Sequence, residues 1–134
     1  MSVEEKLDVL IKAVEQIGFA TKRAGLDDLQ RRGLDRRCYE AIRYGHADKV
    51  KFFLEQGALT FRDDQGKYRT LFSYACEFGH LEVVKVFDKL GLTDKYHDDH
   101  GKTPMEYAVQ KNRVDIIQYF ERHPSLLNRR KVGC

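Results

Sequence analysis

Three stretches of the chain repeat the same pattern of residue types at a spacing of 34 and then 33 residues. Five columns of similar residues run in register through these stretches: Ala41, Ala75 and Ala108; Gly45, Gly79 and Asn112; Asp48, Glu82 and Asp115; Val50, Val84 and Ile117; and Phe53, Phe87 and Phe120. Repetition at a period of this length is the signature of a solenoid, in which each unit packs only on its neighbours. The chain is therefore expected to fold as a stack of equivalent small units.

Each unit has the pattern of two short helices joined by a tight turn. The first apolar segment includes the Ala and ends at Gly or at Asn112, the residue types that most easily adopt the left-handed conformation that ends a helix. In the middle unit, a second segment places Val83, Val84, Phe87 and Leu90 on one helical face. Polar links over 62–70 and 97–104 join the units, and Pro104 is suited to the first turn of a helix.

These residues resemble ankyrin repeats, whose unit of about 33 residues is a turn followed by two helices. The segments "GHLEVV" (79–84) and "DDHGKTP" (98–104) have the most specific resemblance, while Thr70-Leu71 stands where Thr-Pro is usual. The resemblance implies an all-α ankyrin-repeat solenoid with finger loops and an N-terminal capping helix. We expect the repeat domain to span 34–127, with repeats over about 34–61, 62–95 and 96–127.

Residues 1–33 lie outside the repeat and are predicted to form an N-terminal helical cap. Apolar residues step along this segment by four and three positions, as on one face of a helix: Val3, Leu7, Leu10, Val14 and Ile17. Because an open stack exposes an apolar end, we expect this seam to cover it. A dimer contact between two such helices is the alternative. Gly25 and Gly33 are expected to bracket a short segment that leads into the first repeat.

Charge and composition argue against several classes of partner. The net charge is only +3, and the one dense basic stretch is "NRRK" at 128–131, within a basic tail over 128–134, so we predict no nucleic-acid partner. No stretch approaches the 18 or so apolar residues of a membrane span, and we predict no membrane association. Three widely spaced cysteines predict no disulfide framework, which favours the reducing cytoplasm. Nuclear location and secretion without a cleaved signal stay open.

Cys76, Glu77 and His80 could supply a nucleophile or a metal site, but the repeat argues otherwise. Cys76 aligns with Ile42 and Val109, and in such a core column a free Cys behaves as a small hydrophobe. Gly79 is expected to end the first helix between Cys76 and His80, so that the thiol and the imidazole do not share one helix face. We predict that these residues belong to the scaffold.

The stretch "HDDH" (97–100) is the other candidate metal site. Consecutive residues in a turn point in different directions, whereas a metal needs ligands that converge. Asp98 is instead expected to accept backbone N–H groups within the turn. The sequence has no phosphate-binding loop, dinucleotide-binding glycine motif or hydrolase nucleophile motif. We therefore predict a protein that is not an enzyme and that uses no cofactor or metal.

Stacked repeats present a concave face that binds other proteins. The resemblance implies that the contact residues lie on the turns and on the residues that follow the core Ala column. These candidate protein-binding residues are Arg43, Tyr44, Asp64, Gln65, Lys67, Tyr68, Glu77, Phe78, Asp99, His100, Lys102, Gln110 and Lys111. Tyr68 and Arg69 belong to a two-residue insertion that is expected to extend one finger towards a partner.

Tyr44 and Phe78 are the strongest of these candidates because they share one column just before the glycine. Two aromatic residues flanked by Arg43 and Glu77 have the composition of a binding hot spot; the alternative is that each ring packs over the neighbouring unit. We predict a monomeric adaptor that binds another protein through its concave face. The alternative roles are assembly through the N-terminal helix, with a homodimer, and service as one piece of a larger ankyrin protein.

Overall fold

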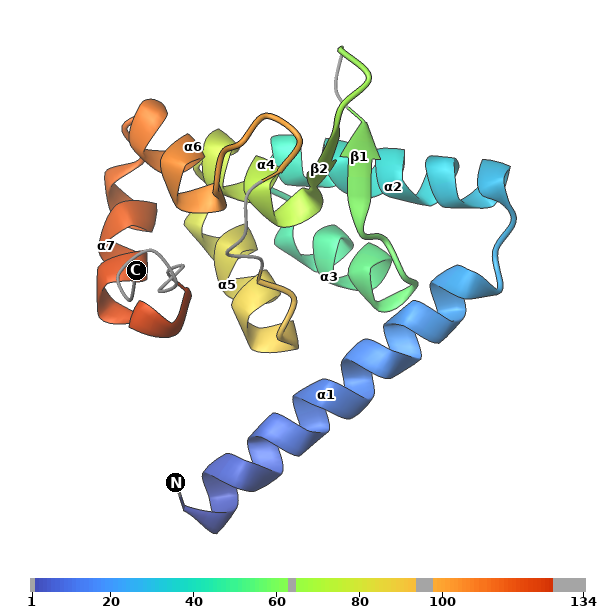
Figure 1. The fold of residues 1–134 in the computed structure, drawn as a ribbon, viewed down its shortest axis with the longest axis horizontal. Helices are drawn as coiled ribbons and strands as arrows, with labels where there is room; N and C mark the ends of the chain where they lie inside the picture. Colours follow the sequence, from blue (N-terminus) through green and yellow to red (C-terminus); the bar gives the residue numbers. More distant parts are fainter. Residues whose placement is uncertain (1, 63–64, 94–97, 127–134) are drawn as a thin grey trace.

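The computed structural model describes residues 2–62, 65–93 and 98–126. Its elements are α1 (Val3–Ala24), α2 (Asp28–Arg43), α3 (Ala47–Glu55), β1 (Thr60–Arg62), β2 (Tyr68–Thr70), α4 (Leu71–Phe78), α5 (Leu81–Leu90), α6 (Pro104–Gln110), α7 (Val114–Arg122) and a 3-10 turn, η1 (Pro124–Leu126). The helices α2, α4 and α6 form one layer and α3, α5 and α7 a second layer (Figure 1). The predicted helix-turn-helix solenoid is confirmed.

The helix boundaries follow from local chemistry. The hydroxyl of Thr70 accepts a hydrogen bond from the Ser73 N–H at the start of α4, and Thr103 does the same at the start of α6, with Pro104 in the first turn. Gly79, which ends α4, has a φ of 85°, and Asn112 has a φ of 55°. These left-handed residues are those predicted from the repeat.

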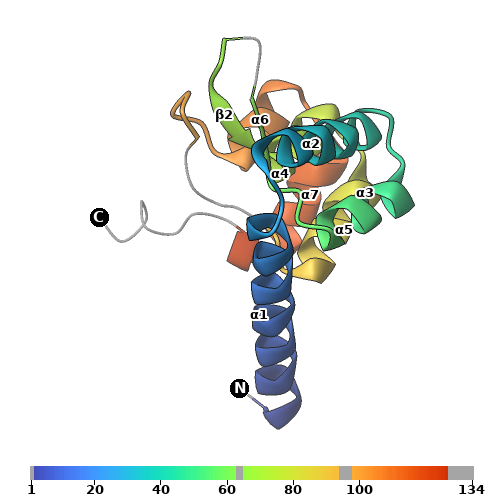
Figure 2. The ribbon, with the colours of Figure 1, turned by 90° about the vertical axis from the view of Figure 1, so that its right-hand side faces the viewer.

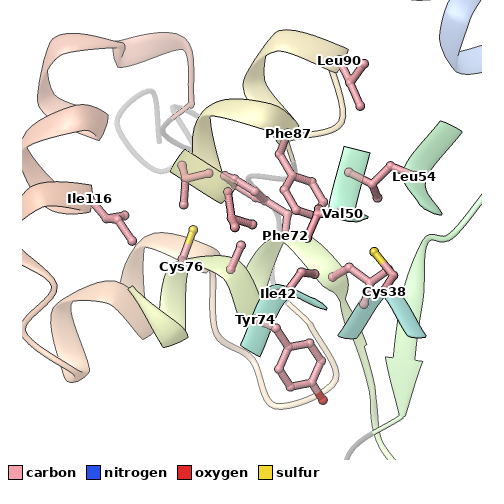
Figure 3. Packing of buried hydrophobic residues seen from close by; sticks show 14 of the residues in the cluster. Cys38, Ile42, Val50, Leu54, Phe72, Tyr74, Cys76, Phe87, Leu90 and Ile116 are labelled. Carbon is pink, nitrogen blue, oxygen red and sulfur yellow. The ribbon is translucent and has the colours of Figure 1, made fainter. Parts of the chain in front are cut away.

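The core lies between the two helix layers (Figure 3). The three aligned alanines are buried, as are Val84 and Phe87 of α5. The ring of Phe72 links the layers, because its centroid lies 5.4 Å from Phe87 and 6.2 Å from Phe120. The predicted core face of the middle unit is confirmed.

The last unit departs from this pattern at one position. Ile42 and Cys76 are fully buried, whereas Val109, which aligns with them, is 55% exposed. Val109 belongs to α6, which packs on α4 on one side. The expected core column therefore holds in the two units that are followed by another unit, and not in the last unit.

A short antiparallel hairpin adds sheet to the helical stack. It pairs Thr60 with Thr70, Phe61 with Arg69 and Arg62 with Tyr68. The hairpin projects from the stack as a finger beside α2 (Figure 1). It occupies the link in which the stretch from Gly66 to Thr70 is two residues longer than the stretch from Gly101 to Thr103. The two inserted residues, Tyr68 and Arg69, are part of the strand pair.

The short segment expected between Gly25 and Gly33 is not separate from the first helix of the stack. Helix α2 starts at Asp28, and Gly33 lies inside it rather than at its beginning. Asp27 and Gln30 form a capping box, in which each side chain bonds the other residue's backbone N–H. This strong N-terminal cap, together with the burial of Asp35 and Cys38, extends the helix through a glycine that has open space around it.

The N-terminal segment forms the predicted helix, but this helix packs through a different face from the one expected. Lys12 donates to the Asp88 carbonyl at 3.3 Å, and Gln16 donates to the Gly91 carbonyl. Figures 1 and 2 show α1 crossing beneath the ends of α3 and α5, with its N-terminal end beyond the stack. Exposure of the seam runs from 54% at Leu7 to 79% at Val3. Polar bonds to helix-end carbonyls, together with Phe19, which is partly buried against the core, therefore hold α1, and the seam does not.

The C-terminal end of α1 is held by an ion pair. The guanidinium of Arg23 contacts both carboxylate oxygens of Asp35 at 2.7 and 2.9 Å and donates to the Gly57 carbonyl at 3.0 Å.

Although α1 is 22 residues long, no described helix combines the length and apolar character required to cross a bilayer.

Replacing Phe87 by Ala is expected to lower the free energy of unfolding by about 3–5 kcal/mol, because a fully packed ring leaves a cavity. Phe52→Ala is the matched control, since Phe52 is 57% exposed, and it should change stability by less than about 1 kcal/mol. Urea unfolding followed by circular dichroism measures both. Equal losses for the two variants would contradict the packing described above.

Candidate protein-binding groove

A groove runs along the stack between the hairpin and the helices α2 and α4. It consists of two hollows, of about 730 Å³ on the α2 side and about 430 Å³ on the α4 side. Tyr39 and Phe61 line both hollows, so the two hollows adjoin at this pair of rings. We call this surface the concave groove.

The floor of the concave groove is a cluster of aromatic rings. Tyr39 stacks on Phe61 with ring centroids 4.2 Å apart, and its edges meet Tyr74 at 4.9 Å and Phe78 at 5.8 Å. The residue-by-residue comparison of the repeats did not select Tyr39, Phe61 or Tyr74. The sequence does contain a signal for Tyr39: it is the one aromatic residue in a column that has polar residues, Ser73 and Glu106, in the other units.

Arg69 lies in the wall of the groove. The expectation that this residue extends outwards towards a partner is therefore wrong. Its side chain is 8% exposed and pairs with Glu77 at 2.9 Å. The guanidinium carbon lies 3.9 Å from the ring centroid of Tyr74 and 3.8 Å from that of Tyr107. Because strand β2 alternates its side chains between two faces, Arg69 points inwards when Tyr68 points out.

Arg69 also links the two finger loops. Its Nε lies 3.7 Å from a carboxylate oxygen of Asp98. The same Asp98 carboxylate accepts the backbone N–H groups of His100 and Lys102 at 2.9 and 3.1 Å, as predicted for this turn. Burial, together with the hydrogen bond that Tyr107 donates to Asp98, raises the pKa of the Tyr107 hydroxyl. Tyr107 is therefore a neutral donor at physiological pH.

The lining of the groove has an excess of positive charge. Seven basic side chains line it: Arg32, Arg36, Arg43, Arg62, Arg69, Lys111 and Arg113. Three acidic side chains accompany them: Asp35, Glu40 and Glu77. All three acidic side chains are paired, Asp35 with Arg23, Glu40 with Arg36 and Glu77 with Arg69, and Arg32 pairs with Asp28 outside the two hollows. The positive excess of the groove therefore rests on Arg43, Arg62, Lys111 and Arg113. On a chain with a net charge of only +3, this groove is a basic surface.

Most of the candidate contact residues line this groove. Arg43, Tyr44 and Tyr68 line the hollow beside α2. The hollow beside α4 is lined by Gln65, Glu77, Phe78, His100 and Lys111. The structure thus brings these eight positions together on one face.

The other described candidates do not line the two hollows. The ammonium of Lys102 donates to Gln110 at 3.1 Å, and the Asp99 carboxylate accepts the Tyr68 N–H at 3.1 Å. Lys67 is exposed, and Asp64 lies outside the described residues. Asp99, Lys102 and Gln110 therefore make contacts within and between the finger loops and α6.

The two aromatic residues of the shared column differ in their surroundings. Tyr44 is 65% exposed, with the Arg43 guanidinium 5.7 Å from its ring centroid. Phe78 is half-buried and packs on Tyr39 of the preceding unit and on Tyr74. Phe78 therefore serves both as packing and as groove surface, while Tyr44 is available to a partner.

The Cys76 and His80 pair has a structural role. The Cys76 side chain is fully buried in the core (Figure 3). The imidazole Nε2 of His80 lies 3.0 Å from the Arg43 carbonyl of the preceding unit. Of the "HDDH" stretch, His97 is outside the described residues. Within the described ranges no three His, Cys, Asp or Glu side chains gather as metal ligands would.

Comparison with known proteins agrees with this geometry. The family model of ankyrin repeats, in three copies, matches residues 38–128. An ankyrin repeat protein of Acanthamoeba polyphaga mimivirus is 22% identical over 87% of this chain and 22% of its own length. Leucine-rich repeat serine/threonine-protein kinase 1 of Mus musculus is 38% identical over 62% of this chain and 4% of its own. Ankyrin repeat domain-containing protein 63 of Homo sapiens is 32% identical over 54% of this chain and 19% of its own. The chain thus spans less than a quarter of each of these relatives.

Replacing Arg69 by Met is expected to lower the free energy of unfolding by about 3 kcal/mol, because a buried ion pair loses one partner. Arg62→Met, in the same hairpin, is the matched control. Arg62 is exposed, with its guanidinium carbon 4.7 Å from the Tyr68 ring centroid, and its loss should cost less than about 1 kcal/mol. Thermal melts compare the two. If Arg69→Met is as stable as Arg62→Met, the hairpin is not anchored by Arg69.

Proposed function

Because the chain belongs to the ankyrin-repeat family, we propose that it is a non-enzymatic adaptor that binds another protein through the concave groove. Ankyrin arrays are protein-interaction modules on a common scaffold, and the site rather than the fold sets the partner. The observation that most supports this role is the exposed ring of Tyr44 at the rim of an aromatic, basic groove. Exposed tyrosine and arginine residues are typical of binding hot spots.

The charges of the groove favour an acidic partner. Because basic side chains outnumber acidic ones by seven to three, an acidic segment would be attracted and a basic one repelled. The aromatic floor would accept an apolar or aromatic side chain of that segment. The proposed ligand is therefore a stretch of protein with several Asp or Glu residues around an apolar anchor.

A basic, aromatic groove also attracts single-stranded nucleic acid, but the rings of the groove floor are not free for base stacking. Bases stack on open ring faces. Here one face of Tyr39 is covered by Phe61, and the Arg69 guanidinium covers Tyr74 and Tyr107. The geometry thus favours a protein partner.

The cytoplasm is the proposed site of this role. Cys38 and Cys76 are buried in the core. Burial, followed by the nearby charge of Asp35, raises the pKa of the Cys38 thiol. Cysteines packed in the core as small apolar side chains are compatible with a reducing compartment, where disulfides are rare.

A second candidate role is structural assembly. Two observations favour it: the apolar seam of α1 faces solvent, and Val109 is exposed while the aligned Ile42 and Cys76 are buried. Each surface is of the kind that another copy, or a further unit of a longer ankyrin protein, would cover.

Selection of short random peptides displayed on phage tests the proposed binding role. The selected peptides should be acidic with an apolar or aromatic residue, and their affinity should fall as salt concentration rises. Tyr44→Ala should weaken binding of a selected peptide about tenfold, or about 1.4 kcal/mol, at an unchanged melting temperature. Fluorescence titration measures the affinity.

Phe52→Ala is the control for this experiment, because Phe52 is an exposed ring on α3 and does not line the groove. Phe78→Ala is less informative, since this half-buried ring also packs on Tyr39 and Tyr74 and its loss should reduce stability. Peptides without acidic residues, or a Tyr44→Ala variant that binds as well as Phe52→Ala, would contradict the proposal. Tighter binding of a single-stranded oligonucleotide that depends on Tyr44 would replace it.

A further inference from the structure

Helix α1 has two faces with opposite roles. A helix turns by 3.6 residues, so that Lys12, Gln16 and Arg23 share one face, and these residues make the bonds to Asp88, Gly91 and Asp35. The apolar seam lies on the opposite face. The exposed fractions along the seam are 79% for Val3, 54% for Leu7, 60% for Leu10, 66% for Val14 and 66% for Ile17. The stack therefore fixes α1 in a position that presents its apolar side to solvent.

We propose that this seam pairs with the seam of a second copy of the chain, with the two α1 helices antiparallel. Single exposed apolar residues are common on protein surfaces. A continuous row over four turns of one helix is not, and rows of this kind mark interaction sites. The inference is independent of the concave groove, which lies beside α2, α4 and the hairpin.

The spacing of the seam matches a helical partner. Steps of four and three residues keep apolar side chains on the line that two crossing helices share. An antiparallel alignment sets Leu7 opposite Ile17 of the second copy, and Leu10 opposite Val14. Ile11, which is 49% exposed, then lies beside its own equivalent at the two-fold axis.

The residues that flank the seam allow close approach. On either side of its central part lie Ile11, Ala13, Gly18 and Ala20, which are uncharged and mostly small. Charged side chains at these flanking positions normally set partner choice and can repel a second copy. In this chain the flanking residues carry no charge and therefore do not repel a second copy. Pairing of the seam with itself is sterically and electrostatically permitted.

The end charges of α1 select the antiparallel orientation. The first turn is acidic, with Glu4 and Glu5, and the last turn is basic, with Lys22 and Arg23. An antiparallel pair places the acidic turn of one copy beside Lys22 of the other. A parallel pair would instead bring like charges together at both ends. Because each stack is bound to the outer face of its own α1, the two stacks lie away from the seam.

The same charges argue against a lipid surface as the occupant. Amphipathic helices that lie on membranes usually have a polar face rich in Lys and Arg. Between residues 3 and 17, α1 has four acidic residues, Glu4, Glu5, Asp8 and Glu15, and two lysines, Lys6 and Lys12. Anionic lipid would repel this segment of the helix, which contains the seam.

The expected dimer dissociates on dilution. A pair of single helices buries less than the roughly 800 Å² per partner of a standard stable interface. The full chain should therefore shift from monomer to dimer as its concentration rises, which sedimentation velocity or light scattering after gel filtration measures directly.

A matched pair of valine substitutions tests the surface. Val14 lies on the seam, and Val9 is an exposed valine of the same helix that lies off the seam (54% exposed). Val14→Lys should give a monomer at every concentration, with an unchanged melting temperature for the stack. Val9→Lys should dimerise as the unmodified chain does. A chain that stays monomeric at the highest soluble concentration, or two variants that behave alike, would overturn the proposal.

Cysteine cross-linking tests the orientation, in chains in which Cys134 is replaced by Ser. A mixture of Leu7→Cys and Ile17→Cys chains should oxidise to the mixed disulfide dimer, while Leu7→Cys alone should not. Efficient cross-linking of Leu7→Cys to itself would show a parallel pair and overturn the antiparallel assignment.

Sedimentation with vesicles of mixed neutral and anionic lipid tests whether the seam binds lipid instead of a second copy. Binding to these vesicles that Val14→Lys abolishes would show a lipid partner and overturn the proposal.

Discussion

A hydrogen bond from each unit to the one before it is the contact on which the stack depends. The His80 imidazole reaches the Arg43 carbonyl, and the Arg113 guanidinium reaches the Glu77 carbonyl at 2.8 Å. Both side chains pass over a glycine of the preceding unit. A Cβ at Gly79 would lie 2.5 Å from Arg113, so the glycine is needed for space as well as for its positive φ. The bond satisfies a helix-end carbonyl and sets the distance between units.

The concave groove follows from this spacing. Tyr39 belongs to the first unit and Tyr74 and Phe78 to the second, and their rings meet only because the first helices lie side by side. Arg69 then closes the groove wall, since its ion pair with Glu77 and its contact with Tyr107 hold the hairpin against the second and third units. The basic surface is therefore built by three units together, and no single repeat contains it.

The sequence predicts the structural features that recur in each unit, because a column of similar residues has a similar environment in each unit. Burial of the alanines, of Cys76 and of Phe87, the left-handed helix ends and the Asp98 turn all follow from columns. Other features depend on contacts that no column records. The seam of α1 identifies an apolar face, but bonds from Lys12 and Gln16 to helix-end carbonyls decide which face meets the stack. Arg69 is buried because Tyr74 and Glu77 of the following helix and Tyr107 of the next unit surround its guanidinium.

The position of α1 also affects how the stack comes apart. In a repeat array each unit contacts only its neighbours, so that units at the ends open first. Helix α1 contacts the ends of both α3 and α5, and it therefore couples the first two units into one cooperative block. The third unit has no such brace among the described residues. Opening of the stack should begin at α6 and α7, which would remove the Tyr107 side of the groove while the Tyr44 side is still folded.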